Sequence, residues 1–280
     1  MKHKDLTIVI TSFRSDTKIN DCLNSIDKEI EVVLIENSDR LEFKKKIEEN
    51  YSNVQCTLAG SNLGYAKGNN LGLSKVKTNY ALILNPDSIL SKKAINNFFL
   101  TIDKLNNNFA IIGPGLDNEK FINFKKRNIN LYEANFVKGF AMFLKISEFK
   151  EIGFFDENIF IYLEEIDLCK RLKKKNKKIY IDTSIEIFHK GGSSHDEVVS
   201  FEMELSRNWH WMWSKFYFNK KHYGYLIAVF KVFKSLISAK IKFFYYLITF
   251  NTFKRKIYQM RLLGLISSMI GKNSYYRPKI

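Results

Sequence analysis

The sequence predicts an α/β domain with a mostly parallel sheet that carries helices on both faces, followed by a basic helical region. Short runs rich in Val, Ile and Leu alternate with helical patterns over the first hundred residues. Strands separated by helices form parallel sheets, because each crossover helix packs on a face of the sheet. The charge then changes: residues 215–280 contain 14 Lys or Arg and no Asp or Glu, which leaves 31 basic and 29 acidic residues in 1–214. This shift predicts a domain over 1–210 and a separate region over 211–280.

The expected elements follow the alternation of apolar runs and helical periodicity. Apolar strands are expected at 6–11, 31–36, 54–59 and 80–85, and helices near 17–27, 41–50, 65–76 and 91–105. Beyond residue 106 the pattern is looser, and it predicts strands over 110–116 and 135–146, a helix over 163–175, and strands over 177–182 and 185–189. No repeat interrupts this order.

Length and composition restrict the class of protein. A chain of 280 residues with 45% hydrophobic residues can bury a substantial core, which excludes general disorder. The three cysteines are scattered and form no CxxC pair, so neither a disulfide framework nor a zinc site is expected. The first apolar run is short and is followed by Arg14, which favours a strand over a signal peptide. These observations predict a cytoplasmic protein.

Polar residues follow several of the expected strands directly. The run Ala81–Leu84 stops at Asn85, Pro86 and Asp87, and the first two strands end in Thr11-Ser12 and Glu36-Asn37. Parallel strands end at the same edge of a sheet, and ligands bind outside that edge. The sequence therefore predicts one polar rim. Asp87 at this rim is either a cation ligand held by its proline or a residue of a turn.

Two further stretches have both a functional and a structural interpretation. In "GSNLGYAKGNNLGL" the glycines recur every four residues, a spacing that matches neither a dinucleotide-binding nor a Walker A motif. The segment either places a helix N-terminus beside a diphosphate or lets the helix pack closely. In "FIYLEEIDLCKRL", Glu164 and Asp167 share a helix face. These acids either form a solvated helix start or supply a general base.

Taken in order, these stretches resemble glycosyltransferase family 2, and especially its rhamnosyltransferase-like branch. The matching segments span about residues 5–200 and are "TIVITSF", "VLIENSD", "AGSNLGYAKGNNLGL", "LILNPDS", "VKGFAMFLKISEFKEIGFFDENIFIYLEEIDLCKRL" and "FHKGGSS". The resemblance implies the Rossmann-like GT-A fold and an inverting, metal-dependent hexosyltransferase. The order and spacing of six motifs make it specific.

The resemblance also implies roles for individual residues. Nucleotide-sugar binding is implied for Thr11, Phe13, Glu36, Asn62, Gly64, Lys67 and Asn85, and acceptor binding for Gly139 and Phe140. Asp87 would hold Mg²⁺ or Mn²⁺, with His189 at the end of its strand as a second ligand. Glu165, or its neighbours Glu164 and Asp167, would take the proton of the acceptor hydroxyl.

Two positions depart from the family pattern. The usual Asp-x-Asp metal signature is Asn85-Pro86-Asp87 here, so only its last position supplies a charged ligand. The usual Glu-Asp pair of the base motif is Glu164-Glu165. The departures leave the identity of the base open among Glu164, Glu165 and Asp167.

The last quarter of the chain is basic, aromatic and amphipathic. On a helical wheel seven apolar residues fall within about 80° of one another, whereas Lys231 and Lys242 point away. No uncharged run approaches the roughly 18 residues that span a bilayer. This pattern is typical of a helix that lies on an anionic membrane. Packing of the stripe on the first domain or on a second subunit, as in a homodimer, is the alternative. The seven residues are Leu226, Phe230, Phe233, Ile237, Ile241, Phe244 and Ile248.

The expected function is transfer of a sugar from a nucleotide donor to a lipid-linked saccharide, in synthesis of bacterial surface polysaccharide such as O-antigen, lipopolysaccharide or capsule. The branch suggests rhamnose from dTDP-rhamnose, with galactofuranose, galactose and N-acetylhexosamine as alternatives. Nucleic-acid binding is disfavoured because no recognition motif accompanies the basic region. Two other classes stay open: a nucleotidyltransferase, although "TSFRSDTKIN" lacks the expected glycine, and a non-catalytic membrane adaptor.

Overall fold

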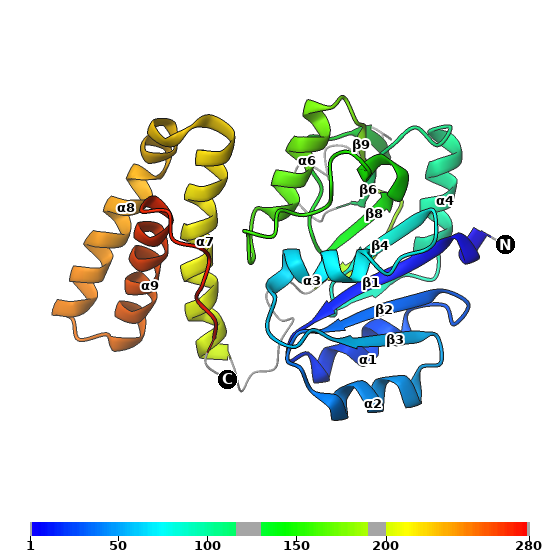
Figure 1. Ribbon diagram of the computed structural model, residues 1–280, viewed down its shortest axis with the longest axis horizontal. Coiled ribbons are helices and arrows are strands. Elements are labelled where there is room, and N and C mark those ends of the chain that lie inside the picture. The colour runs from blue at the N-terminus through cyan, green and yellow to red at the C-terminus, as the bar shows by residue number, and fades with distance from the viewer. Residues whose placement is uncertain (1, 116–129, 190–199, 279–280) are drawn as a thin grey trace. The chain divides into compact units, whose positions relative to one another are not determined.

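A computed structural model describes residues 2–115, 130–189 and 200–278 of the chain (Figure 1). The chain forms two compact units. The sheet unit comprises Met1–Phe155 and Glu165–Asp196, and the helical unit comprises Asp156–Glu164 and Glu197–Ile280. The "KGGSS" part of the last motif, residues 190–194, lies outside the described residues.

The sheet unit contains an eight-stranded, mixed sheet in the order β3-β2-β1-β4-β8-β6-β9-β7. Strands β1, β2, β3 and β4 run parallel to one another, whereas β8 runs antiparallel to both of its neighbours, β4 and β6. A second, two-stranded sheet pairs β5 with β10. The strands are β1 Leu6–Ser12, β2 Glu31–Glu36, β3 Val54–Leu58, β4 Tyr80–Leu84, β5 Ser88–Leu90, β6 Ile111–Pro114, β7 Leu131–Glu133, β8 Ala141–Lys145, β9 Ile179–Asp182 and β10 Ile187–His189.

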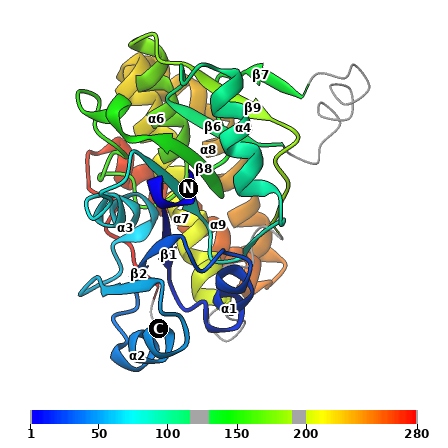
Figure 2. The same ribbon diagram turned by 90° about the vertical axis from the view of Figure 1, so that its right-hand side faces the viewer.

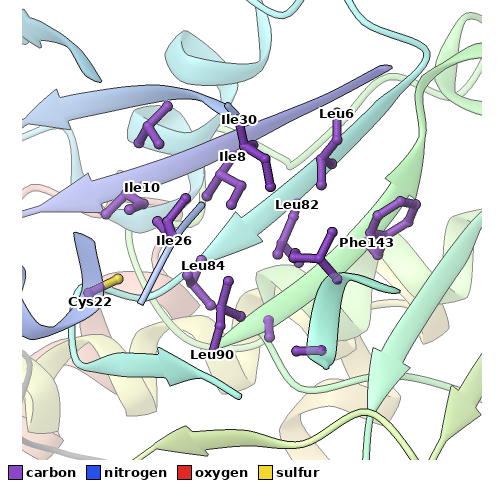
Figure 3. Packing of buried hydrophobic residues seen from close by; sticks show 14 of the residues in the cluster. Leu6, Ile8, Ile10, Cys22, Ile26, Ile30, Leu82, Leu84, Leu90 and Phe143 are labelled. Carbon is purple, nitrogen blue, oxygen red and sulfur yellow. The ribbon is translucent and has the colours of Figure 1, made fainter. Parts of the chain in front are cut away.

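Helices cover both faces of the large sheet, because alternate residues of its central strands point to opposite faces. Ile8 and Ile10 face a cluster that includes residues of α1, α2 and α4, whereas Val9 faces a cluster with α3 and α6. Figure 2 shows α1 and α4 on one side of the sheet and α3 and α6 on the other. Figure 3 shows the first cluster, in which Leu82 and Leu84 lie beside the residues of β1. The helices are α1 Asp16–Asn24, α2 Leu41–Asn50, α3 Gly64–Leu73, α4 Ala94–Lys104 and α6 Glu164–Lys174, with short 3₁₀ helices at Lys2–Asp5 and Ile146–Phe149.

The helical unit consists of three long helices and the segment 156–164. The helices are α7 Ser200–Tyr223, α8 Tyr225–Ile248 and α9 Thr252–Met269, and they lie side by side (Figure 1). Their shared core contains Met212, Phe216, Val232 and Leu265. None of the helices within the described ranges is long and apolar enough to cross a membrane.

The predicted fold class is confirmed: the chain combines a mostly parallel α/β sheet with a C-terminal helical region. The sequence pattern missed the three-residue strands β5 and β7, which are too short for a recognisable alternation. The compact units divide the chain at residue 196, whereas the domain boundary at 210 stays a prediction. Helix α7 runs through residue 210 without a break, so the change in charge falls inside a helix and not at its start.

Candidate functional site

The carboxyl ends of β1, β2 and β4 form the predicted polar rim. Ser12 pairs with Glu36 in the parallel register, and Ile10 pairs with Leu84, one residue before Asn85. Three polar atoms at this rim have no hydrogen-bond partner among the described residues: Thr11 Oγ1, Ser12 Oγ and Asn37 Oδ1, all of them buried. Buried polar atoms normally have partners, so these three atoms are candidates for contacting a polar ligand.

Glu36 at the end of β2 is fully buried and held by an arginine. Its carboxylate accepts a hydrogen bond from the backbone N–H of Arg40 at 2.9 Å, and the Arg40 guanidinium lies 3.5 Å away. The same guanidinium donates to Asp16 at 2.9 Å. Arg40 thereby fixes the position of Glu36 at the rim, where Phe13 is partly buried. Sequence reasoning missed the role of Arg40, because Arg40 and Asp16 lie in different segments and no motif links them.

The glycine-rich segment packs closely on the sheet, which is one of the two interpretations that the sequence left open. A Cβ on Gly72 would lie 2.4 Å from Val9 Cγ1, and one on Gly68 would lie 2.6 Å from Thr11 Cγ2. These two glycines therefore allow α3 to pack directly on β1. Gly64, by contrast, begins α3 with φ +79, a conformation that favours glycine.

The start of α3 is fixed by two asparagines. Asn37 donates from its side chain to the Gly64 carbonyl at 3.0 Å, and Asn62 Oδ1 accepts from the Gly64 N–H at 3.1 Å. Lys67, one turn into the helix, is exposed. The helix start thus lies at the same rim as Asn37, with a lysine close to it in sequence.

Asp87 and His189 come together through the small second sheet. Antiparallel pairing of β5 with β10 sets His189 opposite Ser88, and His189 Nε2 lies 3.3 Å from Asp87 Oδ1. The Asn85 side-chain nitrogen lies 3.5 Å from the same imidazole nitrogen. A buried carboxylate beside an imidazole suits a divalent cation, so these residues fit the metal that the resemblance implies. Within the described ranges no group of three or more His, Cys, Asp or Glu residues forms a metal cluster.

Helix α6 carries the three candidate bases, and they lie in different environments. Asp167 is fully buried and forms an ion pair with Arg171 at 2.8 Å. Arg171 also donates to the backbone carbonyls of Ile152, Gly153 and Phe154, which anchors the preceding loop to α6. Asp167 is therefore engaged in a structural ion pair. The spacing of four residues between Asp167 and Arg171 is the sequence signal that could have predicted this pairing.

Glu165 lies in surroundings that change its proton affinity. Part of its surface is exposed, yet burial of the carboxyl group raises its pKa above the ordinary value of 4.5, and the nearby Lys138 charge lowers it in part. Glu164 is buried. The two residues that precede it, Tyr162 and Leu163, both have positive φ, at 74 and 70. Such backbone conformations are costly for non-glycine residues and often occur at functional sites.

The dipeptide Gly139-Phe140 lies against both groups of residues. The Phe140 ring stacks on His189 with 4.6 Å between centroids, and its carbonyl accepts from the Asn85 N–H at 2.8 Å. A Cβ on Gly139 would lie 3.8 Å from Glu165 Cβ. Tyr65 on α3 donates its hydroxyl proton to the Gly139 carbonyl. The structure thus brings Asp87, His189 and Glu165 to the start of β8. Sequence reasoning missed Tyr65, although this aromatic residue lies inside a quoted motif.

One protein family and several known proteins resemble this chain. Residues 7–184 match the family described as Glycosyl transferase family 2. The chain is 28% identical over 199 residues to the low-salt glycan biosynthesis hexosyltransferase Agl10 of Haloferax volcanii, which covers 62% of this chain and 64% of that protein. It is 24% identical over 226 residues to the rhamnosyltransferase WbbL of Escherichia coli K12, which covers 69% and 83%. The chain thus spans slightly less than two thirds of the length of Agl10.

Solved structures show the same fold. The mannosyltransferase PcManGT from Pyrobaculum calidifontis, in complex with GDP-Man and Mn²⁺, has a TM-score of 0.57 at 10% identity and covers 95% of this chain and 87% of its own. S. aureus TarS has a TM-score of 0.54 at 15% identity and covers 72% and 39%. At these identities the likeness shows the GT-A fold alone. The family match, by contrast, includes more than half of the sequence, and the chain therefore belongs to glycosyl transferase family 2.

Proposed function

We propose that this glycosyltransferase moves rhamnose from dTDP-rhamnose to a lipid-linked saccharide, with inversion at the anomeric carbon, during synthesis of a bacterial surface polysaccharide. The donor is suggested by the similarity to a protein named as a rhamnosyltransferase. Galactofuranose, galactose and N-acetylhexosamine are the alternative donor sugars. A lipid-linked acceptor would hold the enzyme at the cytoplasmic face of the plasma membrane as a peripheral protein.

The observation that carries this proposal is the position of Gly139-Phe140 between two chemical groups. Phe140 stacks on His189 beside Asp87, and Gly139 lies against Glu165. A donor diphosphate near Asp87 and an acceptor hydroxyl near Glu165 would then meet at the start of β8. Glu165 would take the hydroxyl proton, and the incoming oxygen would displace the nucleoside diphosphate in a single inverting step.

The proposed reaction includes a divalent cation, and two residues of this chain would hold it. Asp87 and His189 would bind Mg²⁺ or Mn²⁺, which would neutralise charge that develops on the leaving diphosphate. Asn85 lies beside the same imidazole but carries no charge. With a single carboxylate at this corner, we expect the cation to bind weakly until the donor diphosphate supplies further oxygen ligands.

The buried, unpartnered atoms at the rim support binding of the nucleotide. Thr11 Oγ1 and Asn37 Oδ1 lie where the ends of β1 and β2 meet the start of α3. A helix N-terminus near a diphosphate stabilises its negative charge, since the first backbone N–H groups of a helix lack partners within it. The proposed diphosphate position is therefore beside Gly64 and Lys67.

Release of nucleoside diphosphate tests the proposal. The full chain is incubated with a panel of nucleotide sugars and a lipid-linked saccharide, with and without Mn²⁺, and product is measured for the wild type, Asp87→Ala and Glu165→Gln. We expect release with one donor, dependent on the cation and strongly reduced in both variants. Glu49→Gln, an exposed substitution on α2 with the same change in charge as Glu165→Gln, is the control and should leave release unchanged.

Other outcomes would replace the proposal. Absence of release with every donor would favour a non-catalytic membrane adaptor. Release of pyrophosphate from a nucleoside triphosphate and a sugar phosphate would identify a nucleotidyltransferase. Full activity of Asp87→Ala would remove the metal role from that residue.

A further inference from the structure

Helix α8 has two apolar faces, and its smaller residues form the face that packs inside the helical unit. Ala228, Val232 and Ala239 are the buried residues of this helix. Ala228 and Val232 belong to the core that contains Phe216 of α7 and Leu265 of α9. Val229 and Leu236 of α8 pack against the same core and stay partly exposed.

Seven large apolar side chains of α8 lie on the other face and are exposed. Leu226 is 83% exposed and Phe230 is 82% exposed, and the rest of the stripe is exposed by 40% or more. On a helical wheel the stripe is centred about 160° from the buried face, so it cannot turn into the core of the unit without unpacking α8. A continuous patch of seven large apolar residues is uncommon on a soluble surface and marks an interaction site.

Lysines border this stripe on both sides. Lys240 and Lys234 lie about 20° beyond the two edges of the stripe on the wheel, and both are exposed. Lys231 and Lys242 lie further round, where their ammonium groups contact the rings of Tyr223 and Tyr258. Lysines at the edges of an apolar face can extend their charged ends into a headgroup layer while their carbon chains stay in apolar surroundings.

The charge of the surrounding sequence also favours contact with lipid headgroups. No Asp or Glu occurs after Glu204, and the start of α9 adds Lys254, Arg255 and Lys256. The turn between α8 and α9 also exposes Phe250. Two helices without acidic residues, one of them with a wide apolar face, match a layer of anionic headgroups above acyl chains.

We propose that the outer face of α8, defined by the seven stripe residues with Lys234 and Lys240, docks on an anionic lipid bilayer with the helix axis parallel to the membrane plane. The proposal assigns a surface and a partner to the helical unit, and it does not depend on which sugar the sheet unit transfers. A second copy of the chain fits less well, because self-association through this face would bring lysines together without a carboxylate to pair with them.

Vesicle binding by the full chain tests the apolar part of this surface. We measure flotation with phosphatidylcholine vesicles that contain about a third phosphatidylglycerol, and with phosphatidylcholine alone. The wild type should bind the anionic vesicles, and binding should weaken as salt screens the charges. The double variant Leu226→Asn/Phe230→Asn should bind about tenfold more weakly or worse. Leu100→Asn, at an exposed leucine of α4, is the control and should bind as the wild type does.

A charge-matched pair tests the lysines. Lys234→Gln/Lys240→Gln should weaken binding to anionic vesicles, whereas Lys45→Gln/Lys46→Gln, on exposed residues of α2, removes the same charge elsewhere and should not. Equal loss in both pairs would show that net charge alone attracts the protein, and would overturn the assignment to α8. Light scattering that shows a dimer dissolved by Leu226→Asn/Phe230→Asn would overturn it as well.

The vesicle-binding experiments can be distinguished from the test of the proposed transfer reaction. Asp87→Ala should bind vesicles as well as the wild type does, because Asp87 lies in the sheet unit and Leu226 in the helical unit. The α8 variants should in turn release nucleoside diphosphate at the wild-type rate with an acceptor dispersed in detergent. Failure of vesicle binding with intact release would overturn the docking surface alone.

Discussion

The two units of this chain use apolar residues in opposite ways. In the sheet unit, alternate residues of β1 and β4 are buried on both faces, and what remains at the strand ends is polar. In the helical unit three small residues of α8 are buried while seven of its large apolar side chains are exposed. Helices on both faces of a sheet bury the apolar side chains of its strands. In the three-helix unit, by contrast, one face of α8 keeps apolar side chains exposed, and these can contact another partner.

The largest difference between the units should appear in catalysis, which we expect to reside in the sheet unit alone. Glu165→Gln should lower the turnover rate by about 10²–10⁴-fold, the usual contribution of a general base. Because burial raises the pKa of Glu165 above 4.5, wild-type turnover should fall as pH drops through that raised pKa, where the carboxylate is protonated. The measurement is the pH profile of nucleoside diphosphate release. An unchanged profile in Glu165→Gln would assign the base to another residue.

Stability at two helix glycines compares the packing of the units. A Cβ on Gly264 of α9 would lie 2.1 Å from the Trp209 carbonyl oxygen, whereas one on Gly72 of α3 would meet the side chain of Val9 at 2.4 Å. Backbone yields less than a side chain, so Gly264→Ala should cost about 3 kcal/mol and Gly72→Ala nearer 1 kcal/mol. Both changes gain the same helix propensity, which cancels in the comparison. Chemical denaturation measures both, and equal costs would contradict the reasoning.

Acid should destabilise the helical unit through His210. This imidazole is buried, and burial lowers its pKa from 6.5 to about 3, with Arg277 acting in the same direction and the carbonyl of Tyr276 opposing it. In the unfolded chain the His210 imidazole takes up a proton below about pH 6.5, whereas in the folded unit it does so only below about pH 3. Protons therefore stabilise the unfolded chain between these two pH values, and the free energy of unfolding should fall as the pH drops from 6.5 to 3. Between pH 7 and pH 5 the loss should reach about 2 kcal/mol.

Tryptophan fluorescence reports this unfolding selectively, because Trp209, Trp211 and Trp213 are the three tryptophans of the chain and all lie on α7. His210→Gln cannot take up the proton, so its stability should depend less on pH. If the variant and the wild type lost stability equally, another group would be responsible.

The smallest effect is expected on the outer face of α8. Leu226→Asn should change the free energy of unfolding by no more than about 0.5 kcal/mol, since the side chain is 83% exposed. Val232→Asn, which buries an amide on the inner face, should cost about 2 kcal/mol or more. Thermal unfolding compares the two variants. A large cost for Leu226→Asn would mean that the outer face packs within the protein.

Much of the sheet unit could be predicted because its signals are local. The strands from Leu6 to Leu84 alternate with helices, and parallel strands must bring their polar ends to one rim. The rim of Thr11, Glu36 and Asn85 followed from this rule alone, and the registers of β1 with β2 and β4 confirm it. The roles of these residues stay predictions.

Contacts between distant segments could not be predicted in the same way. The residues around His189 contain no signal that predicts the pairing of β10 with β5. This pairing places the His189 imidazole 3.3 Å from Asp87. Among the candidate bases, the spacing of Asp167 and Arg171 could have predicted their ion pair. Only the packed structure shows that Glu165 lies beside Gly139.

The amphipathic stripe of α8 depends both on the sequence and on tertiary packing. Its seven large apolar residues and the absence of acids after Glu204 are properties of the sequence, since helical periodicity alone aligns them. The periodicity does not decide which face of a helix is buried. Tertiary packing decided it, because the close approach of α7, α8 and α9 admits Ala228 and Ala239 and leaves Leu226 and Phe230 outside.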